Sequence, residues 1–520
     1  MLSVVTFLYI RRPAPLCAKA RAVTVNPCDL DAVTARRLIG SKKLSASELL
    51  ESCIARTMAV DPAVNAMVAR DFDRARVAAA RADQQTMRGD ALPALHGLPV
   101  GVKDLEDVAG LRTTYGSPLF AHHVPSRDQF IVSLVREAGG IIAGKTNTPE
   151  WGAGANTRNA VYGATGNPHN PQMSAAGSSG GSAVALATGM VPLATGSDTG
   201  GSLRNPAAFC GIVGFRPTPG LVPSDKRSFG WSNLPVLGPM ARTVPDLCLL
   251  LSAIVSDSAV DPLATTVEGA KIRKAKDFAT PAEIDLAGLR VALSADFGFA
   301  PTERHIRTVF AEKTALFADA FAVAETAAPD CAGMDETFEV LRAMGFLASH
   351  YDKVRDTPDQ VGPNVRANVE EALRYGAMDI VRAMKQQTVL YHRFQAFFER
   401  YDVMITPSVT ISPRPWSELY PVEIDGTPTR TYFHWLALAY APTTVGHPAL
   451  SLPVGRDHHG MPFGLQIVGR RGGDAKVLAV AAALERLLAK DVRTARPVPD
   501  IAALMAAPKI SDQPGFLGFG

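Results

Sequence analysis

The sequence predicts an α/β protein, built on a β-sheet with helices on both of its faces. From about residue 98 to residue 488, short apolar runs of strand length alternate with amphipathic stretches of helical length, and this alternation is typical of the α/β class. No run repeats along the 520 residues, and the spacing shows no clear internal boundary. Hydrophobic residues make up 47% of the chain and charged residues 20%, which is the balance of a globular protein.

The bulk composition excludes several function classes. A net charge of +3 is small for this length, and no basic run is interleaved with aromatic residues, so we expect no nucleic-acid partner. No apolar run reaches the roughly 18 to 20 residues of a membrane span. The six cysteines are scattered without a CxxC pair. This argues against a zinc site and a disulfide framework and favours a reducing cytoplasm.

The first 27 residues are expected to be a poorly ordered extension. Met1 to Ile10 is apolar, and Arg11 and Arg12 follow it, which reverses the order found in a signal peptide. We interpret this as a loose extension or a start codon placed too far upstream, with a secreted form as the alternative.

Helices dominate from there to about residue 90. Ser45 and Glu48 form a capping box that opens a helix over Ala46 to Ala59, and Pro62 begins another short helical piece. The elements expected next are a helix over Asp73 to Arg88, a strand over Leu98 to Lys103, a helix over Phe130 to Glu137 ended by Gly139 and Gly140, and a strand over Ile141 to Ala143.

The second half continues the alternation. Helices are expected over Thr302 to Phe321, Phe338 to Ala348, Glu370 to Arg400 and Asp474 to Leu488. Strands are expected over Leu289 to Ser294, Val403 to Ile405, Ala449 to Val454 and Phe463 to Val468. Residues 255–285 and 353–368 are the expected surface excursions.

Two Gly/Ser clusters lie in the centre of the chain, Gly177 to Ser182 and Thr199 to Ser202. Between them, the apolar segment Ala183 to Ala194 suits a buried helix followed by a strand, so a flexible linker is disfavoured. Glycine serves where the backbone needs a positive φ or a close approach. The two loops therefore predict a site at which backbone N–H groups face a ligand.

Two local patterns compete for this region. Gly139 to Thr146 matches the phosphate-binding pattern G-x-x-x-x-G-K-[ST], but the expected strand falls inside it and no helix follows, so we expect Lys145 on the surface or in a turn. Ser179 sits in a G-x-S-x-G pattern, the nucleophile elbow of α/β-hydrolase esterases. That elbow needs a buried strand upstream, and Asn170 to Ser174 is polar and contains proline.

A serine enzyme without a histidine base fits these residues better. Lys103 ends a strand, and a neutral, desolvated lysine can act as base for Ser178, Ser179 or Ser202. The N–H groups of Thr199, Gly200, Gly201 and Ser202 could stabilise an oxyanion. Asp198 and Arg204 flank this second loop and are expected to pair and hold it in place.

The clusters resemble the amidase signature family. Gly177 to Ser182 is similar to its G-S-S-G-G-S block, Asp198 to Pro206 to its D-x-G-G-S-[ILV]-R-x-P block, and Gly97 to Asp104 to its lysine strand. Further similar segments follow in the family's order, and the resemblance covers roughly residues 28 to 490. It implies one domain over 28–495 with a mixed, twisted central sheet, an N-terminal extension over 1–27 and a C-terminal tail over 496–520.

The resemblance also implies roles that the residues alone leave open. Ser202 would be the nucleophile, Ser178 the bridging serine on a cis peptide bond, Lys103 the base and Ser179 a supporting residue. The reaction would cleave amide bonds of small or medium substrates, including aryl, cyclic or carbamate ones, through an acyl-enzyme. It requires no metal or organic cofactor, and a homodimer is compatible with it.

Departures from the family's pattern concern specificity. Arg216 replaces a common lysine, and Pro219 to Ser224 differs from the tyrosine-containing turn of tRNA-linked glutamine amidotransferase subunits. Such an ammonia-releasing subunit, the G-x-S-x-G esterase, a P-loop protein and a non-catalytic binding module remain as alternatives. Trp231, Tyr432 and Trp435 are candidates for lining a substrate pocket, or are ordinary core or surface aromatics.

Overall fold

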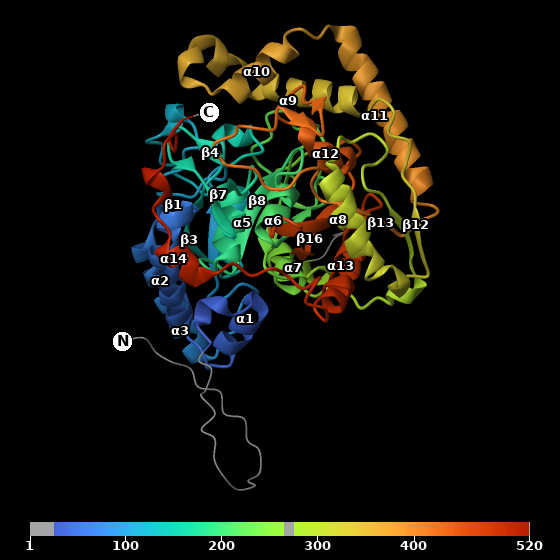
Figure 1. Ribbon diagram of the computed structural model, residues 1–520. Coiled ribbons are helices and arrows are strands. Elements are labelled where there is room, and N and C mark those ends of the chain that lie inside the picture. Colours follow the sequence, from blue (N-terminus) through green and yellow to red (C-terminus); the bar gives the residue numbers. More distant parts are fainter. Residues whose placement is uncertain (1–24, 265–274, 519–520) are drawn as a thin grey trace.

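A computed structural model describes residues 25–264 and 275–518. The extension expected over residues 1–27 therefore lies almost wholly outside the described residues. An 11-stranded mixed sheet runs through the molecule (Figure 1) and confirms the predicted α/β class. From edge to edge, its strands are β1 (Met67–Arg70), β3 (Ile141–Thr146), β2 (Pro99–Lys103), β8 (Leu193–Asp198), β10 (Val236–Ala241), β9 (Val213–Arg216), β16 (Ala449–Arg456), β17 (Pro462–Gly469), β13 (Val403–Pro407), β11 (Arg290–Leu293) and β12 (Val323–Thr326).

Both parallel and antiparallel pairs occur in this sheet. β2 runs parallel to both β3 and β8, and β11 runs parallel to β12 and β13. Antiparallel pairs join β8 through β10, β9, β16 and β17 to β13. Outside the sheet, short ribbons pair β4 (Arg158–Asn159) with β5 (Gly163–Ala164), β6 (Gly166–Asn167) with β7 (Asn170–Ser174), and β14 (Glu423–Ile424) with β15 (Thr427–Pro428).

Helices cover both faces of the sheet. The helices are α1 (Ala32–Gly40), α2 (Ala46–Val64), α3 (Phe72–Arg88), α4 (Phe130–Glu137), α5 (Gly180–Ala187), α6 (Arg204–Cys210), α7 (Val244–Ile254), α8 (Arg304–Ala315), α9 (Met334–Asp356), α10 (Pro363–Ala372), α11 (Ala377–Phe397), α12 (Ala437–Thr444), α13 (Asp474–Leu488) and α14 (Ile501–Ala506). None of them, over the ranges that the structure describes, has the length and apolar character that crossing a membrane needs.

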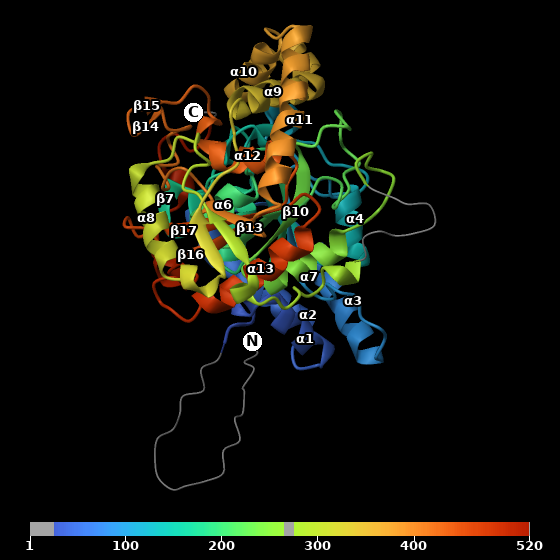
Figure 2. The same ribbon diagram turned by 90° about the vertical axis from the view of Figure 1, so that its right-hand side faces the viewer.

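Two hydrophobic cores lie on opposite sides of the sheet, because successive strand residues point to opposite faces. Leu193 and Ala241 belong to the core that contains α4, α7 and α13. Their chain neighbours Ala194 and Met240 belong to the other core, which contains α5 and α6. Helices α9, α10 and α11 stand beyond this second side, at the top of both views (Figures 1 and 2). These three helices form an outer layer beyond the buried helices α5 and α6.

Several predicted elements need correction. The strand expected to stop at Ala143 continues to Thr146. The helix expected over 370–400 is two helices, α10 and α11, divided before Gly376. The helix expected over 302–321 is α8 with a separate short turn after it, and Thr302 lies two residues before it. The excursion expected over 353–368 is mostly helical.

The capping box at Ser45 and Glu48 is present as predicted, and its helix runs on through Pro62 to Val64.

Candidate active site

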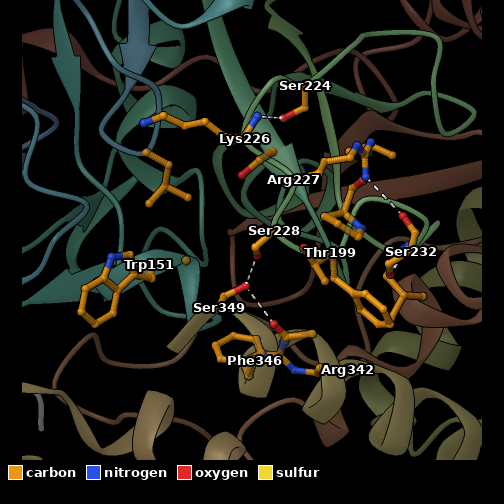
Figure 3. A pocket seen from close by; sticks show the side chains of 18 of the residues that line it. Trp151, Thr199, Ser224, Lys226, Arg227, Ser228, Ser232, Arg342, Phe346 and Ser349 are labelled. Carbon is orange, nitrogen blue, oxygen red and sulfur yellow. Dashed lines mark hydrogen bonds between the residues drawn. The ribbon is translucent and has the colours of Figure 1, made fainter. Parts of the chain in front are cut away.

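The serine-rich loops meet at a cavity of about 280 Å³ between the carboxyl ends of β2 and β8 and helix α9. Ser178, Ser197, Thr199 and Ser202 line it from the loop side. Figure 3 shows the opposite wall, where Phe346 and Ser349 extend from α9. The remaining lining residues are Leu105, Trp151, Gly152, Ser224, Lys226, Arg227, Ser228, Phe229, Ser232, Leu234, Pro235, Val236, Leu237, Leu341, Arg342, Gly345 and His350.

Lys103 lies behind the serines that line this cavity, because β2 and β8 are parallel neighbours. Parallel strands bring their carboxyl ends to one edge of a sheet, where sites are commonly built. Gly101 pairs with Ala194, so Lys103 at the end of β2 comes level with Gly196, near the end of β8. Its Nζ lies 2.7 Å from Ser178 Oγ, 2.8 Å from Ser179 Oγ and 2.9 Å from Ser197 Oγ.

The charge state of Lys103 follows from its burial. The side chain has no solvent exposure, and burial disfavours the ammonium form. This lowers the pKa of Lys103 from 10.5 to about 7, although the carboxylates of Glu106 and Asp198 act in the opposite direction. A neutral amine near neutral pH can accept a proton from a serine hydroxyl.

A buried polar cluster lies beneath Lys103. Thr195 accepts the Lys103 backbone N–H at 3.2 Å and donates its own hydroxyl to Glu106. Lys145 is wholly buried in β3, where it donates to the Glu106 carbonyl and lies 3.8 Å from the Asp104 carboxylate. The prediction that Lys145 lies on the surface or in a turn is wrong, because its strand is longer than expected and a carboxylate lies beneath it.

The first glycine loop leads directly into α5. The Gly177–Ser178 peptide bond is cis, and Ser178 Oγ lies beside Lys103. At Gly181, a Cβ would lie 2.8 Å from two backbone oxygens, those of Ala66 and Asn147. Only glycine permits so close an approach, and it seats the start of α5, and with it Ser179, under the sheet edge.

The second loop is held by a fully buried ion-pair cluster around Asp198. Arg204 donates to both carboxylate oxygens of Asp198, at 2.8 and 3.0 Å, and Arg216 approaches the same carboxylate at 3.2 Å. Burial by itself raises the pKa of Asp198, but the two guanidinium groups hold it well below its usual range. Arg204 also bonds the Ala439 carbonyl and Gln466, at 2.7 and 2.6 Å, which ties the loop to α12 and β17.

The N–H groups of this loop divide into two sets. Gly201, at φ +118°, donates its N–H to Asp198 Oδ1 at 2.9 Å, and Leu203 donates to Oδ2 at 3.2 Å. Within the described residues, the N–H groups of Thr199, Gly200 and Ser202 have no protein acceptor. Of these three residues, Thr199 and Ser202 line the cavity.

The aromatic candidates from the sequence lie elsewhere. Trp231 is 79% exposed, and neither it nor Tyr432 or Trp435 lines the cavity. The aromatic walls come instead from Trp151, Phe229 and Phe346. No sequence motif marks these three, because separate loops and a helix distant in sequence bring them together.

The two competing local patterns do not find their required contexts. Residues 170–174 do form a strand, β7, but it pairs with β6 and, through one isolated bridge, with Pro415, outside the central sheet. Ser179 is fully buried and contacts Lys103 rather than a histidine.

In the described part of the chain, no three His, Cys, Asp or Glu side chains gather in a way that could hold a metal ion.

Comparison with known proteins gives consistent relatives. The amidase family profile matches residues 48–478. The chain is 34% identical over 453 residues to an acylamidase of Rhodococcus erythropolis, covering 86% of this chain and 93% of that one. It is 31% identical over 477 residues to a glutamyl-tRNA(Gln) amidotransferase subunit of Thermosynechococcus vestitus, covering 86% and 96%. The crystal structure of a bacterial aryl acylamidase of the amidase signature family is similar with a TM-score of 0.81 at 25% identity, covering 93% and 99%.

Proposed function

The chain belongs to the amidase signature family and is an amidase-family hydrolase, and from that premise we propose that it cleaves amide bonds of small or medium substrates through an acyl-enzyme on Ser202. The observation that supports this most is the contact of a buried lysine, Lys103, with Ser178 at 2.7 Å beside a cavity that Ser202 also lines. A base, a relay hydroxyl and a nucleophile are the parts that serine catalysis without histidine requires.

The proton moves in two steps. Neutral Lys103 accepts the hydroxyl proton of Ser178, and Ser178 accepts that of Ser202 as Ser202 Oγ attacks the carbonyl carbon. When the tetrahedral intermediate collapses, the C–N bond breaks and Ser178 returns a proton to the leaving amine. Water then attacks the acyl-enzyme with the same base, which frees the carboxylic acid and restores Ser202.

The negative oxygen of the intermediate is stabilised by backbone donors. The N–H groups of Thr199, Gly200 and Ser202 are the candidates, since that of Gly201 already donates to Asp198. Each well-placed donor is worth roughly 3 to 4 kcal/mol in related sites. The buried Asp198–Arg204 pair holds this loop rigid, which is how preorganised donors avoid reorganisation during the reaction.

The lining favours substrates with an apolar or aromatic part. Trp151, Phe229 and Phe346 offer aromatic faces, and about 280 Å³ admits a small molecule rather than a folded chain. Similar structures include an aryl acylamidase and a 6-aminohexanoate cyclic dimer hydrolase, the latter with a TM-score of 0.77, and their names denote an aryl amide and a cyclic amide. Aryl and cyclic amides are therefore the first substrates to assay, followed by carbamates.

Replacing Ser202 by alanine tests the proposal. We expect Ser202→Ala to reduce kcat for a 4-nitroanilide by about 10⁴-fold or more, because no other group can form the acyl-enzyme. Ser133→Ala, at a half-buried serine of α4 outside the cavity, should leave kcat unchanged. Retained turnover in Ser202→Ala would exclude Ser202 as the nucleophile. A fluorophosphonate adduct found on Ser179 instead of Ser202 would favour the esterase alternative.

A glutamine amidotransferase subunit is the second candidate, supported by the identity to glutamyl-tRNA(Gln) amidotransferase subunits over most of the chain. Such a subunit releases ammonia from glutamine for a second active site. The purified chain should therefore be assayed with glutamine beside the anilides. Faster ammonia release from glutamine than anilide cleavage would favour the amidotransferase role over the independent amidase.

A further inference from the structure

Arg342 is a buried cation without a protein partner inside the candidate cavity. It lies on α9, is 7% exposed and lines the cavity. Across the described residues, its guanidinium takes part in no hydrogen bond or ion pair, and its Nε is buried with no acceptor. A guanidinium cannot shed its charge at neutral pH, so this is an unusual arrangement, because buried charges are normally paired.

The groups around Arg342 do not neutralise it. The rings of Phe346, Phe433 and Tyr432 lie 4.3, 5.1 and 5.2 Å from its Cζ. Aromatic faces attract a cation but accept no strong in-plane hydrogen bond. The carboxylate whose charge it senses, Glu371, accepts a hydrogen bond from Tyr375 at 2.8 Å instead. The in-plane N–H groups of Arg342 are therefore available to a ligand in the cavity.

The other two cations of the cavity differ in this respect. Lys226 is paired with Asp107, and Arg227 is paired with Asp261 at 2.8 Å. No carboxylate lines the cavity in the part of the chain described. Figure 3 shows Arg342 on the α9 wall and Lys226 and Arg227 on the wall opposite. The cavity thus carries positive charge on two sides, of which only that of Arg342 is uncompensated.

We propose that Arg342 binds a carboxylate carried by the amide substrate, so that the enzyme prefers amides with an anionic group on the part that lies against α9. This rests on the proposed amide hydrolysis and names its substrate class. A planar carboxylate matches the two-pronged geometry of a guanidinium. The stacked rings hold the guanidinium plane in place before the substrate arrives, which reduces the ordering cost of binding.

Matched substrates test the preference on both sides of the scissile bond. Glutaryl 4-nitroanilide and valeryl 4-nitroanilide differ by a carboxylate in place of a methyl group on the acyl side. 4-Butyrylaminobenzoate and butyryl 4-toluidide differ in the same way on the amine side. We expect kcat/KM to favour the anionic member of one pair by about tenfold or more, since hydrogen bonds to charged groups are the strong ones.

Variants of Arg342 connect the preference to this residue. Arg342→Gln should bring the ratio of the favoured pair close to one, because kcat/KM for the anionic member falls by more than that for the neutral member. Arg342→Lys should keep part of the ratio. Arg355→Gln, on the exposed side of the same helix where Arg355 pairs with Asp356, should leave the ratio unchanged. A wild-type ratio near one in both pairs, or a ratio that survives Arg342→Gln, would overturn the proposal.

Binding without turnover separates this proposal from the proposed function. Calorimetry of glutaryl 4-nitroanilide with Ser202→Ala should show affinity about tenfold higher than with Ser202→Ala combined with Arg342→Gln. That difference, if the wild-type enzyme cleaves no amide, would support the anion site and refute the hydrolysis. Equal affinities for the two proteins, each shown to be folded by its thermal unfolding, would refute the anion site whatever the enzyme hydrolyses.

Discussion

Two opposing influences act on the pKa of Lys103. Burial removes water from its ammonium group, while Glu106 and Asp198 favour the charged form. Burial is the larger influence and brings the pKa to about 7. Three serine hydroxyls within 2.9 Å can both donate to the neutral amine and accept from the ammonium. The residue is therefore poised to exchange protons near neutral pH.

This predicts the pH profile of the reaction. A base works only when deprotonated, so kcat/KM for a neutral anilide should rise with pH through about 7, the pKa of Lys103, and level off above it. Glu106→Gln removes a carboxylate that raises this pKa, so its rising limb should move to lower pH. Rates measured from pH 5 to 9 define the rising limb of the wild-type enzyme and that of Glu106→Gln. A flat wild-type profile, or a limb that Glu106→Gln moves to higher pH, contradicts the assignment of Lys103 as base.

Single residues also show where sequence reasoning reaches its limit. The residues alone leave Ser178, Ser179 and Ser202 open as partners of Lys103, and the family resemblance predicts roles for Lys103, Ser178 and Ser202 because each block carries its own pattern. The sequence wrongly predicts Lys145 on the surface or in a turn. Its partners in the fold, the Asp104 carboxylate and the Glu106 carbonyl, lie about 40 residues earlier in the chain, so the local sequence does not show them. No motif marks Arg342, because its proposed role depends on α9 and on the loop of Thr199 to Ser202, which are more than 100 residues apart in the sequence.

Helix α5 is the element that aligns the two serine loops. Its start is pressed against the backbone of residue 147, and its residues are buried throughout. Residue 147 cannot move easily, because it follows directly after β3, which lies between β1 and β2, and its N–H donates to the Ala66 carbonyl at 2.9 Å. The position of Ser179, and of Ser178 before it, therefore depends on the absence of a side chain at Gly181.

Gly181→Ala should destabilise the protein by about 1 to 3 kcal/mol, the usual cost of overpacking, and should reduce kcat as the serines shift. A Cβ there would meet Asn147 N and lie 2.8 Å from the carbonyl oxygens of Ala66 and Asn147. Urea denaturation measures the first effect and anilide hydrolysis the second. Gly288→Ala, where a Cβ meets nothing within 4 Å, is the matched control. Unchanged stability and kcat in Gly181→Ala would show that α5 tolerates displacement.

The predicted elements are most accurate where periodicity alone decides. β13, β16, β17 and α13 appear close to their expected bounds. The sequence predicts no strand at β10, since Gly238 and Pro239 interrupt its apolar pattern and proline is rare in central strands. It nevertheless pairs with β8 along its whole length, because the tertiary environment overrides local propensity. The glycine loops can be located from sequence, but the cavity walls cannot.

The C-terminal segment of the chain packs against elements of its N-terminal half. Helix α14 lies against α2 (Figure 1). Beyond it, Arg158 donates to the Gly515 carbonyl at 2.6 Å, and Ala164 donates to that of Phe516 at 3.2 Å. This segment follows the end of the amidase family match at residue 478. It adds contacts to the part of the fold that carries the first serine loop.

Ile510 is the anchor of that segment and should contribute measurably to stability. It is 3% exposed and packs in a small cluster with Ala164 and Trp416. Ile510→Ala should reduce the free energy of unfolding by about 2 kcal/mol, the lower end for a buried isoleucine, because the cluster lies at the periphery. Leu517→Ala, at a side chain that is 59% exposed, should change it by less than about 0.5 kcal/mol.

Urea denaturation midpoints compare the two variants. Anilide hydrolysis at about 25 °C should be unaffected in both, since neither residue lines the cavity. Equal midpoints would mean that the segment only rests on the surface, whereas lost hydrolysis in Ile510→Ala would mean that it supports the serine loops directly.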